Sequence, residues 1–212
     1  MVGELRQISQ WSEAAEHLNM LIGTIRSDLF PLRHRDHGGF TESGAPHTIS
    51  REFSCYVDYL GSLYTGEAES ERGDRFEEYL REVLGEINPL YANHCKLIRE
   101  MYRNGPVHEF DPKTLFNRSG DHIGWMESTG SSPGKWNQGD SQTINIRHLN
   151  IIQHPNHSRD YYLPVFTSQL LDDLIRSIEL FEGGIGDLRA RVISWNRAAA
   201  ILNQPKRFDW SK

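Results

Sequence analysis

The sequence predicts a mainly α-helical protein: a bundle of helices with one inserted β-hairpin. Over most of the chain, apolar residues recur at three- and four-residue spacing, which is the period of a helix with one buried face. Within residues 121–152 the pattern changes, and Ile144, Ile146 and His148 alternate with other residues as in a strand. The 212 residues, 37% of them hydrophobic, can form one sizeable core, so we expect a single domain over 1–212.

The first 47 residues are expected to form an N-terminal helix followed by a loop. Proline ends this helix at Pro31, and its apolar face consists of Leu5, Ile8, Trp11, Ala15, Leu18, Ile22, Ile25 and Leu29. Residues 33–47 are rich in glycine, histidine and arginine, which favours a loop. The bundle should then occupy residues 48–205, beginning with a helix whose apolar face is Ile49, Phe53, Tyr56, Leu60 and Leu63.

Four more helices complete the predicted bundle. The third should stop before Pro89, and the fourth should end at Gly105-Pro106, since glycine favours helix ends and proline cannot donate to the helix. The fifth and sixth are expected over 163–181 and 185–199. Between the fourth and the fifth, segments 122–128 and 143–152 read as the two strands of the inserted hairpin, with the turn-rich stretch TGSSPGKWNQGDSQ between them.

Charge and composition exclude some classes of protein. A formal net charge of −6 argues against a protein that coats DNA or RNA, which would carry a broad basic face. It leaves room for an enzyme that touches RNA through a small basic patch. No apolar run reaches the length of a membrane span, and the first residues lack the pattern of a secretory signal. With Cys55 and Cys95 interpreted as reduced core thiols, we expect a cytoplasmic protein without a membrane partner.

The stretch RNGPVH, residues 103–108, combines groups suited to phosphate chemistry. The planar guanidinium of Arg103 matches phosphate oxygens. His108 can exchange a proton near neutral pH, and Asn104 can orient either side chain. The Gly-Pro bend could turn the histidine back toward the arginine. A purely structural interpretation stays open, in which Asn-Gly-Pro stops the helix and Arg103 interacts with the helix dipole.

This stretch resembles the R-x(4-6)-H motif, with a polar residue after the arginine, of the HEPN (higher eukaryotes and prokaryotes nucleotide-binding) superfamily. The resemblance extends to the helices around it, from roughly residue 48 to residue 200. It implies a helical bundle, a metal-independent ribonuclease without a cofactor, and a homodimer in which two motifs face each other. Arg103, Asn104 and His108 would be the catalytic set, and the chain would be a toxin or a defence effector.

Three further residues are candidate helpers. Lys96 and Arg99 precede Arg103 on the same predicted helix and could extend a basic stripe toward the RNA phosphates; the alternative is an ordinary solvated face. Asp58 interrupts the otherwise apolar stretch CYVDYLG. It could orient a histidine or pair with Arg103, or it could be a surface residue.

Two other functions remain open. One is a HEPN-like module without catalysis that binds a nucleotide or a protein partner, which by family resemblance would be an antitoxin. The other is a metal-dependent hydrolase, since the chain has ten histidines, some paired in HRDH (34–37) and HPNH (154–157). Both pairs fall outside the predicted helices, where His-x3-His or Glu-x2-His ligand sets usually lie. We therefore expect no metal site.

Overall fold

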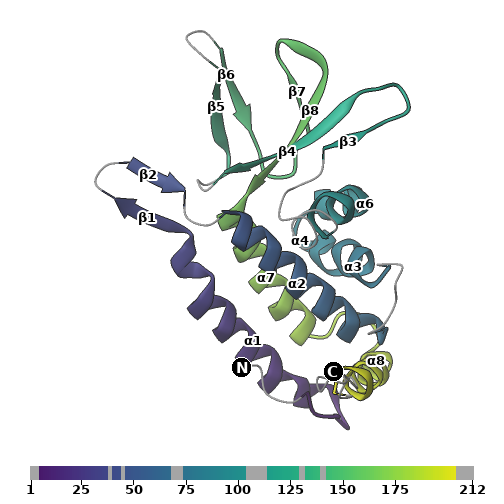
Figure 1. Ribbon diagram of the computed structural model, residues 1–212. Helices are drawn as coiled ribbons and strands as arrows, with labels where there is room; N and C mark the ends of the chain where they lie inside the picture. Colours follow the sequence, from purple (N-terminus) through teal and green to yellow (C-terminus); the bar gives the residue numbers. More distant parts are fainter. Residues whose placement is uncertain are drawn as a thin grey trace, which may run out of the picture.

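The computed structural model describes residues 5–37, 40–43, 46–67, 74–103, 114–128, 132–138 and 142–203. Side chains are described for these residues except 34–37, 40–43, 46, 74, 102, 103, 137, 138 and 142. The described part is mainly helical with a small mixed sheet, which confirms the predicted fold class at that level. Figure 1 shows the helices packed together at one end and the strands gathered at the other.

The long helices form the centre of the bundle. Helix α2 (Pro46–Thr65) packs against α7 (Thr167–Glu182), α8 (Leu188–Leu202) and the short helix α3, while α1 (Ala14–Asp28) packs against α7. A 3-10 turn, η1 (Trp11–Glu13), precedes α1, and a second, η2 (Phe30–Leu32), follows it. The buried faces of α1, α2 and α7 largely follow the apolar stripes that the sequence predicts, because residues three and four apart lie on one side of a helix. In α8 the buried residues are Trp195, Ala198 and Ala199, whereas Leu188 of the predicted stripe is 46% exposed.

The first helix begins later than the sequence predicts. Leu5 and Ile8 precede it in extended chain, yet both are buried. The extended stretch is held against α8, since the Ile8 amide donates to Asn196 Oδ1 (2.8 Å) and the Trp195 indole donates to the Arg6 carbonyl (2.9 Å). Apolar residues buried in this way fit a helical period without being helical.

Two helical segments lie along one side of the bundle. The first comprises α3 (Asp74–Tyr79), the π-helical turn η3 (Leu80–Leu84) and α4 (Gly85–Ile87). The second comprises α5 (Pro89–Asn93), α6 (Cys95–Ile98) and the π-helical turn η4 (Arg99–Arg103). Asn88 separates the two, and its side chain accepts from the Leu90 amide (3.1 Å), so the proline after it occupies the first position of a capped helix.

The strands pair differently from the predicted hairpin. Strand β4 (His122–Ser128) pairs in parallel with β8 (His157–Phe166), and the short strands β3 (Leu115–Phe116) and β7 (Ile152–His154) flank them in the order β3-β4-β8-β7. Strand β6 (Gln142–Ile146) pairs with β5 (Gly134–Gln138) in a separate antiparallel hairpin. The expected strand at 143–152 is thus divided between β6 and β7, and neither part pairs with residues 122–128.

Two more segments differ from the sequence-based expectation. The predicted loop at 33–47 contains an antiparallel pair of strands, β1 (His34–His37) and β2 (Phe40–Ser43). Leu163 and Phe166 belong to β8 rather than to the fifth helix, which begins at Thr167. Strand β8 continues directly into α7, so an apolar strand end and an apolar helix face follow one another without a turn between them.

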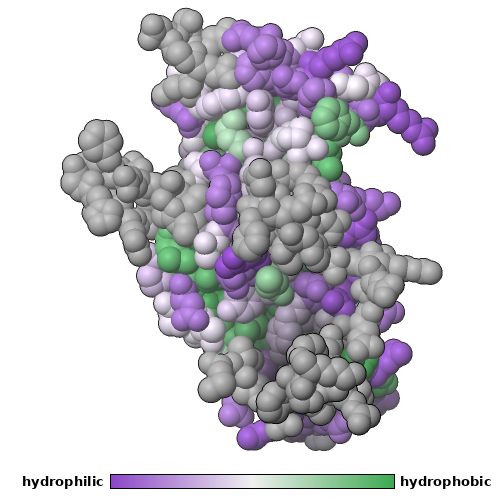
Figure 2. Space-filling model, viewed as in Figure 1, coloured by the Kyte–Doolittle hydropathy of each residue, from purple (hydrophilic) through white to green (hydrophobic). Residues whose placement is uncertain are grey.

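One apolar core connects the bundle and the inner face of the sheet. Rings of Trp11, Tyr64, Tyr79, Phe181 and Trp195 meet at its far end, with centroids 5.0–6.2 Å apart. At the sheet, Leu163 and Val165 of β8 are fully buried, and Ile123 and Trp125 of β4 pack beside them. The visible surface over the strands is largely hydrophilic, with small apolar areas (Figure 2).

Candidate functional site

The motif that carries the family resemblance lies at the edge of the described structure. Arg103 is the last residue of η4, which packs against α2. Its side chain is outside the described part of the chain, and so are Asn104 and His108. The structure therefore describes the backbone of Arg103 as helical, and the predicted helix end at Gly105-Pro106 lies outside the described residues.

The two predicted phosphate contacts differ in their surroundings. Lys96 is exposed on α6. The guanidinium of Arg99 is paired with two carboxylates, Glu77 and Glu100, at 2.7 Å each. Glu77 is buried, and it belongs to α3 whereas Arg99 belongs to η4. The ion pair between Arg99 and Glu77 therefore joins two helical segments. A phosphate that approached Arg99 would compete with these carboxylates.

Asp58 lies in an ion pair within the bundle. Its two carboxylate oxygens accept from Arg75 Nε (3.1 Å) and Nη2 (2.7 Å), and Arg75 also donates to the Glu67 carbonyl (3.0 Å). This forked contact joins α2 to α3 beside Gly61, where the two backbones approach so closely that a Cβ would meet the Arg75 carbonyl. Asp58 thus has a structural role in the described geometry.

A cleft of about 460 Å³ opens where the bundle meets the strands. Helix α7, the turn between α4 and α5, and the turn after β6 form its walls. Its lining residues are Ile87, Asn88, Pro89, Leu90, Ser132, Arg147, His148, Asn150, Gln169, Asp173 and Arg176. The volume is in the range of small-molecule sites, which typically combine apolar walls with a few polar groups.

A buried hydrogen-bond chain forms the back of this cleft. The Phe166 amide donates to His148 Nδ1 (3.0 Å), so Nδ1 is the acceptor nitrogen and the proton of the neutral ring resides on Nε2. Nε2 lies 3.0 Å from the Tyr91 hydroxyl, and that hydroxyl donates to Asp173 Oδ2 (3.0 Å). In each of these three hydrogen bonds the donor and the acceptor are therefore defined, from the Phe166 amide through His148 and Tyr91 to the Asp173 carboxylate.

His148 is held neutral in this chain. Burial lowers the pKa of its imidazole to about 3. A proton on Nδ1 would also face the Phe166 amide, a second donor. His148 is consequently a positioning residue for Tyr91 and Asp173 and is unsuited to acid–base exchange near neutral pH.

Asp173 is the ionisable end of the chain. It is 1% exposed, and burial raises the pKa of its carboxyl, whereas hydrogen bonds from Gln169 (2.8 Å to Oδ1) and Tyr91 and the nearby charge of Arg176 lower it. At the mouth of the cleft, Arg147 and Arg176 are exposed. The cleft thus offers an acceptor at its base and cations at its rim.

Tyr91 and Asp173 were not predicted as site residues from the sequence, and His148 was predicted only as part of a strand. One signal could have identified Asp173. It lies on the apolar stripe of α7, between Leu170 and Leu174 in the three-four spacing, and Ser177 continues the same face. A charged residue on a buried helix face needs a partner.

A second carboxylate is buried at the start of α2. Glu127 of β4 accepts from the Ser50 hydroxyl (2.6 Å), and His47 Nδ1 lies 2.8 Å from its other oxygen without the alignment of a hydrogen bond. Burial raises the pKa of Glu127, while Ser50 and His47 oppose this. The exposed His47 ring stacks on Trp125. This arrangement places an exposed imidazole at the surface beside a buried carboxylate.

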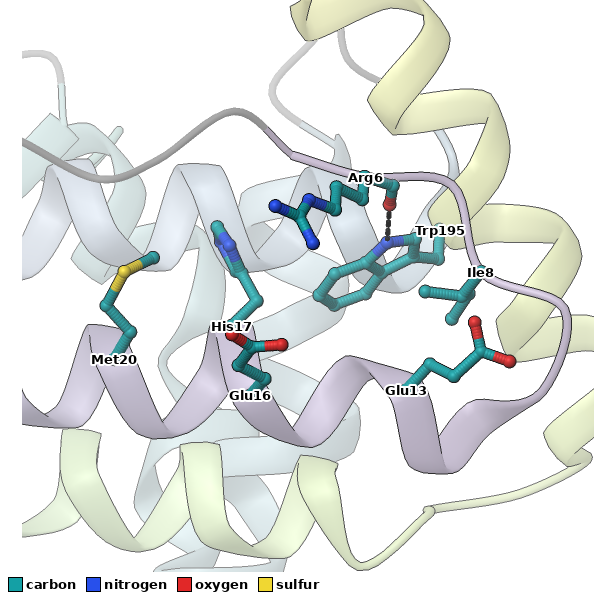
Figure 3. A pocket seen from close by; sticks show the side chains of 7 residues that line it. All are labelled: Arg6, Ile8, Glu13, Glu16, His17, Met20 and Trp195. Atoms are coloured by element: carbon teal, nitrogen blue, oxygen red, sulfur yellow. Dashed lines mark hydrogen bonds between the residues drawn. The ribbon is translucent and has the colours of Figure 1, made fainter.

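A smaller pocket, of about 250 Å³, lies between α1 and α8 (Figure 3). The figure shows the Arg6 guanidinium extending past the Trp195 ring toward His17. His17 Nε2 lies 2.7 Å from the Tyr59 hydroxyl; burial lowers the pKa of His17 and raises that of Tyr59 to about 12. Both groups are therefore neutral at physiological pH, and their contact joins α1 to α2.

The described ranges can also be compared with the needs of a metal site and of a membrane span. There, no group of three or more histidine, cysteine, aspartate or glutamate side chains could hold a metal ion. The rings of His154 and His157 lie 4.6 Å apart on β7 and β8, whereas the side chains of His34 and His37 are outside the described set. None of the described helices is long and apolar enough to cross a bilayer.

Comparisons with known proteins return no relative. No protein-family model matches the sequence, and the searches of curated proteins and of solved structures give no match either.

Proposed function

We propose that this chain is a HEPN-like, metal-independent endoribonuclease whose catalytic set is Arg103, Asn104 and His108. The observation that supports this most is the position of Arg103 at the end of η4, packed on α2 in a mainly helical protein. The motif residues thus follow a fixed helical segment. In cells, the enzyme would act as a toxin or a defence effector.

The proposed reaction is an internal transfer at phosphorus. His108 removes the proton of the ribose 2′-hydroxyl, the 2′-oxygen bonds to phosphorus, and the 5′-oxygen leaves with a proton from a general acid. The products are a 2′,3′-cyclic phosphate and a 5′-hydroxyl. Arg103 stabilises the charge on the phosphate oxygens. One motif supplies one histidine, so a homodimer with facing motifs would supply both base and acid.

The test is RNA cleavage in EDTA by the wild type, His108→Ala and His157→Ala. His157 is an exposed histidine on β8 and serves as the matched control. We expect His108→Ala to lower the rate by about 100-fold or more, the usual contribution of a general acid or base, and His157→Ala to leave it unchanged. If His108→Ala cleaved RNA at the wild-type rate, the catalytic assignment would be refuted. If cleavage gave no 2′,3′-cyclic phosphate, the mechanism would be refuted.

The dimer is tested separately. Sedimentation should show a dimer, and mixing inactive Arg103→Ala with inactive His108→Ala should restore part of the activity if each site uses both chains. A fully active monomer would eliminate the dimer while leaving the catalytic set in place.

A second candidate function is a HEPN-like module that binds a nucleotide or an antitoxin-like protein without catalysis. The ion pairs of Arg99 with Glu77 and Glu100 favour it, because they neutralise a cation that RNA binding near Arg103 could use. The overall charge of −6 acts in the same direction. Under this alternative, neither the wild type nor His108→Ala cleaves RNA, and both bind the partner equally.

A further inference from the structure

We infer that the cleft between α7 and the turn after β6 binds the phosphate group of a small phosphate monoester. The cleft is separate from the motif, because Leu90 lines it at the start of the α5–η4 segment and Arg103 is at the other end of that segment. The inference concerns binding alone and does not depend on the proposed cleavage. A ligand can use only those polar groups of the cleft that have no partner within the protein.

The acceptors at the back of the cleft are already occupied. Asp173 is 1% exposed, and its two oxygens accept hydrogen bonds from Tyr91 and Gln169. His148 is buried as well, with Nδ1 accepting from the Phe166 amide and Nε2 against the Tyr91 hydroxyl. Neither the carboxylate nor the imidazole therefore offers a ligand an open position, and recognition depends on the more exposed side chains of the lining.

The half-buried polar side chains of the lining retain unused hydrogen-bond donors. Asn88 Oδ1 accepts from the Leu90 amide (3.1 Å), which leaves the N–H groups of the Asn88 side chain for a ligand. Ser132 Oγ accepts from the His148 amide (3.1 Å), which leaves the Ser132 O–H. Within the described ranges, no protein acceptor takes either donor. The cleft therefore presents donors to an entering group, which is the arrangement that an anion requires.

Two arginines add positive charge to these donors. Arg147 and Arg176 are exposed and line the cleft, and neither guanidinium forms an ion pair with another described residue. The charge of Arg176 lowers the pKa of the Asp173 carboxyl, which is the one acid of the lining. Because His148 is neutral, the lining has two cations against one buried acid, in a chain whose net charge is −6. Arginine binds phosphate oxygens through its planar set of donors, so this local charge suits a phosphate dianion.

The size of the cleft and its apolar wall indicate a monoester rather than a free phosphate ion. The volume of about 460 Å³ is in the range of small-molecule sites. Ile87, Pro89 and Leu90 provide apolar surface on either side of Asn88 in the chain. An organic group joined to the phosphate by one ester bond can contact this surface, while the terminal oxygens accept from the donors of the cleft. A diester has fewer terminal oxygens and less charge, so it should bind more weakly.

Calorimetric titration with phenyl phosphate, inorganic phosphate and phenol tests the inference at about pH 8, where a phosphate monoester is a dianion. We expect phenyl phosphate to bind about threefold or more tightly than inorganic phosphate, because its ring gains apolar contact, and phenol to give no measurable binding. The diester methyl phenyl phosphate should bind more weakly than phenyl phosphate. Added sodium chloride should weaken the binding of both phenyl phosphate and inorganic phosphate.

Variants of the lining identify the site. Arg147→Ala should weaken phenyl phosphate binding by about tenfold or more, as for the loss of a hydrogen bond to a charged group. Arg197→Ala removes the same charge from an exposed position on α8 and is the matched control, with unchanged affinity. Asn88→Asp keeps an acceptor for the Leu90 amide, so the cap of α5 is retained, but it replaces the donor with a carboxylate and should also weaken binding by about tenfold or more.

Four results would overturn the inference. They are no binding of either phenyl phosphate or inorganic phosphate, phenyl phosphate bound no more tightly than inorganic phosphate, equal affinity for phenyl phosphate and methyl phenyl phosphate, and wild-type affinity in Arg147→Ala or Asn88→Asp. RNA cleavage enters none of these titrations, so the proposed nuclease activity and this binding site are tested separately.

Discussion

The bundle and the strands differ in how completely they are buried. Helices α1, α2 and α7 each place several side chains at zero or near-zero exposure. Strand β4 is half-buried along nearly its whole length, and β8 is exposed at its start and buried only over its last four residues. Free energy from apolar burial is therefore concentrated in the helices.

The buried bundle and the boundary between strands and helices also differ in their polar groups. The cleft and the Glu127–His47 pair both lie where strands meet helices, and both combine a buried carboxylate with an exposed basic side chain. Buried polar groups can be tolerated at this boundary because apolar burial in the adjoining helices stabilises the fold. Four measurements of the free energy of unfolding test this difference, and they follow in order of decreasing expected change.

The largest effect should come from the far end of the bundle. Phe181→Ala removes a fully buried ring that packs on Trp11, Tyr64 and Tyr79. We expect a loss of about 3–5 kcal/mol in the free energy of unfolding, measured by urea denaturation. Ile193→Ala, at a 61% exposed position on α8, is the control and should cost less than about 0.5 kcal/mol. A loss below about 1 kcal/mol for Phe181→Ala would contradict the assignment of stability to the bundle.

The next effect should appear at the boundary, as a pH dependence from His148. Its pKa is about 3 when folded and about 6.5 when unfolded, so the unfolded state takes up the proton first. Stability is therefore lost as pH falls below about 6.5, by roughly 2 kcal/mol at pH 5.

The comparison of His148→Gln with the wild type isolates this contribution. The variant should lose less stability than the wild type between pH 7 and pH 5, whereas exposed His157→Gln should behave as the wild type. Asp173, whose pKa is raised by burial, acts in the opposite direction and is present in all three proteins. Identical pH profiles for wild type and His148→Gln would show that His148 is not buried as a neutral group.

A smaller effect is expected from the ion pair between α2 and α3. Asp58→Asn, Arg75→Gln and the double variant form a cycle whose coupling energy should be about 1 kcal/mol, since the pair is forked but partly accessible to water. The coupling should decrease at high salt. A coupling near zero would indicate that the helices are joined by apolar packing alone.

The smallest effect is expected at the end of the sheet. Phe116 is 68% exposed on β3, where its ring contacts His122 at 4.4 Å between centroids. Phe116→Ala should change the free energy of unfolding by less than about 0.5 kcal/mol. A cost above 1 kcal/mol would mean that the strands contribute more to stability than their exposure suggests.

The local part of the fold could be predicted from the sequence. The stripes of α1, α2 and α7 and the stop before Pro89 follow from spacing and from proline chemistry, which act over a few residues. The pairing of β4 with β8 could not be predicted, because it joins residues such as Ile123 and Tyr161 that are far apart in the chain. Leu163 and Phe166 were misplaced because three-residue spacing fits both a helix and the end of a buried strand.

The candidate site divides in the same way. That Arg103 belongs to a helical segment could be predicted from the local apolar spacing, whereas the predicted helix end at Gly105-Pro106 stays a prediction. The chain of His148, Tyr91 and Asp173 brings together three distant segments, and each residue considered singly resembles an ordinary member of its strand or helix. Only the interruption of an apolar face by Asp173 hinted at it.

The uninterrupted passage from β8 into α7 has a consequence for protein engineering. Phe166 ends the strand, Thr167 begins the helix, and the Phe166 amide is held by His148. A cut between these residues would break the covalent link between β8 and α7. The helix would then no longer be connected to the residue whose amide donates to His148. The strands and the helices should therefore be expressed as one piece, and a tag or fusion partner is better inserted at an exposed turn such as that around Ser119.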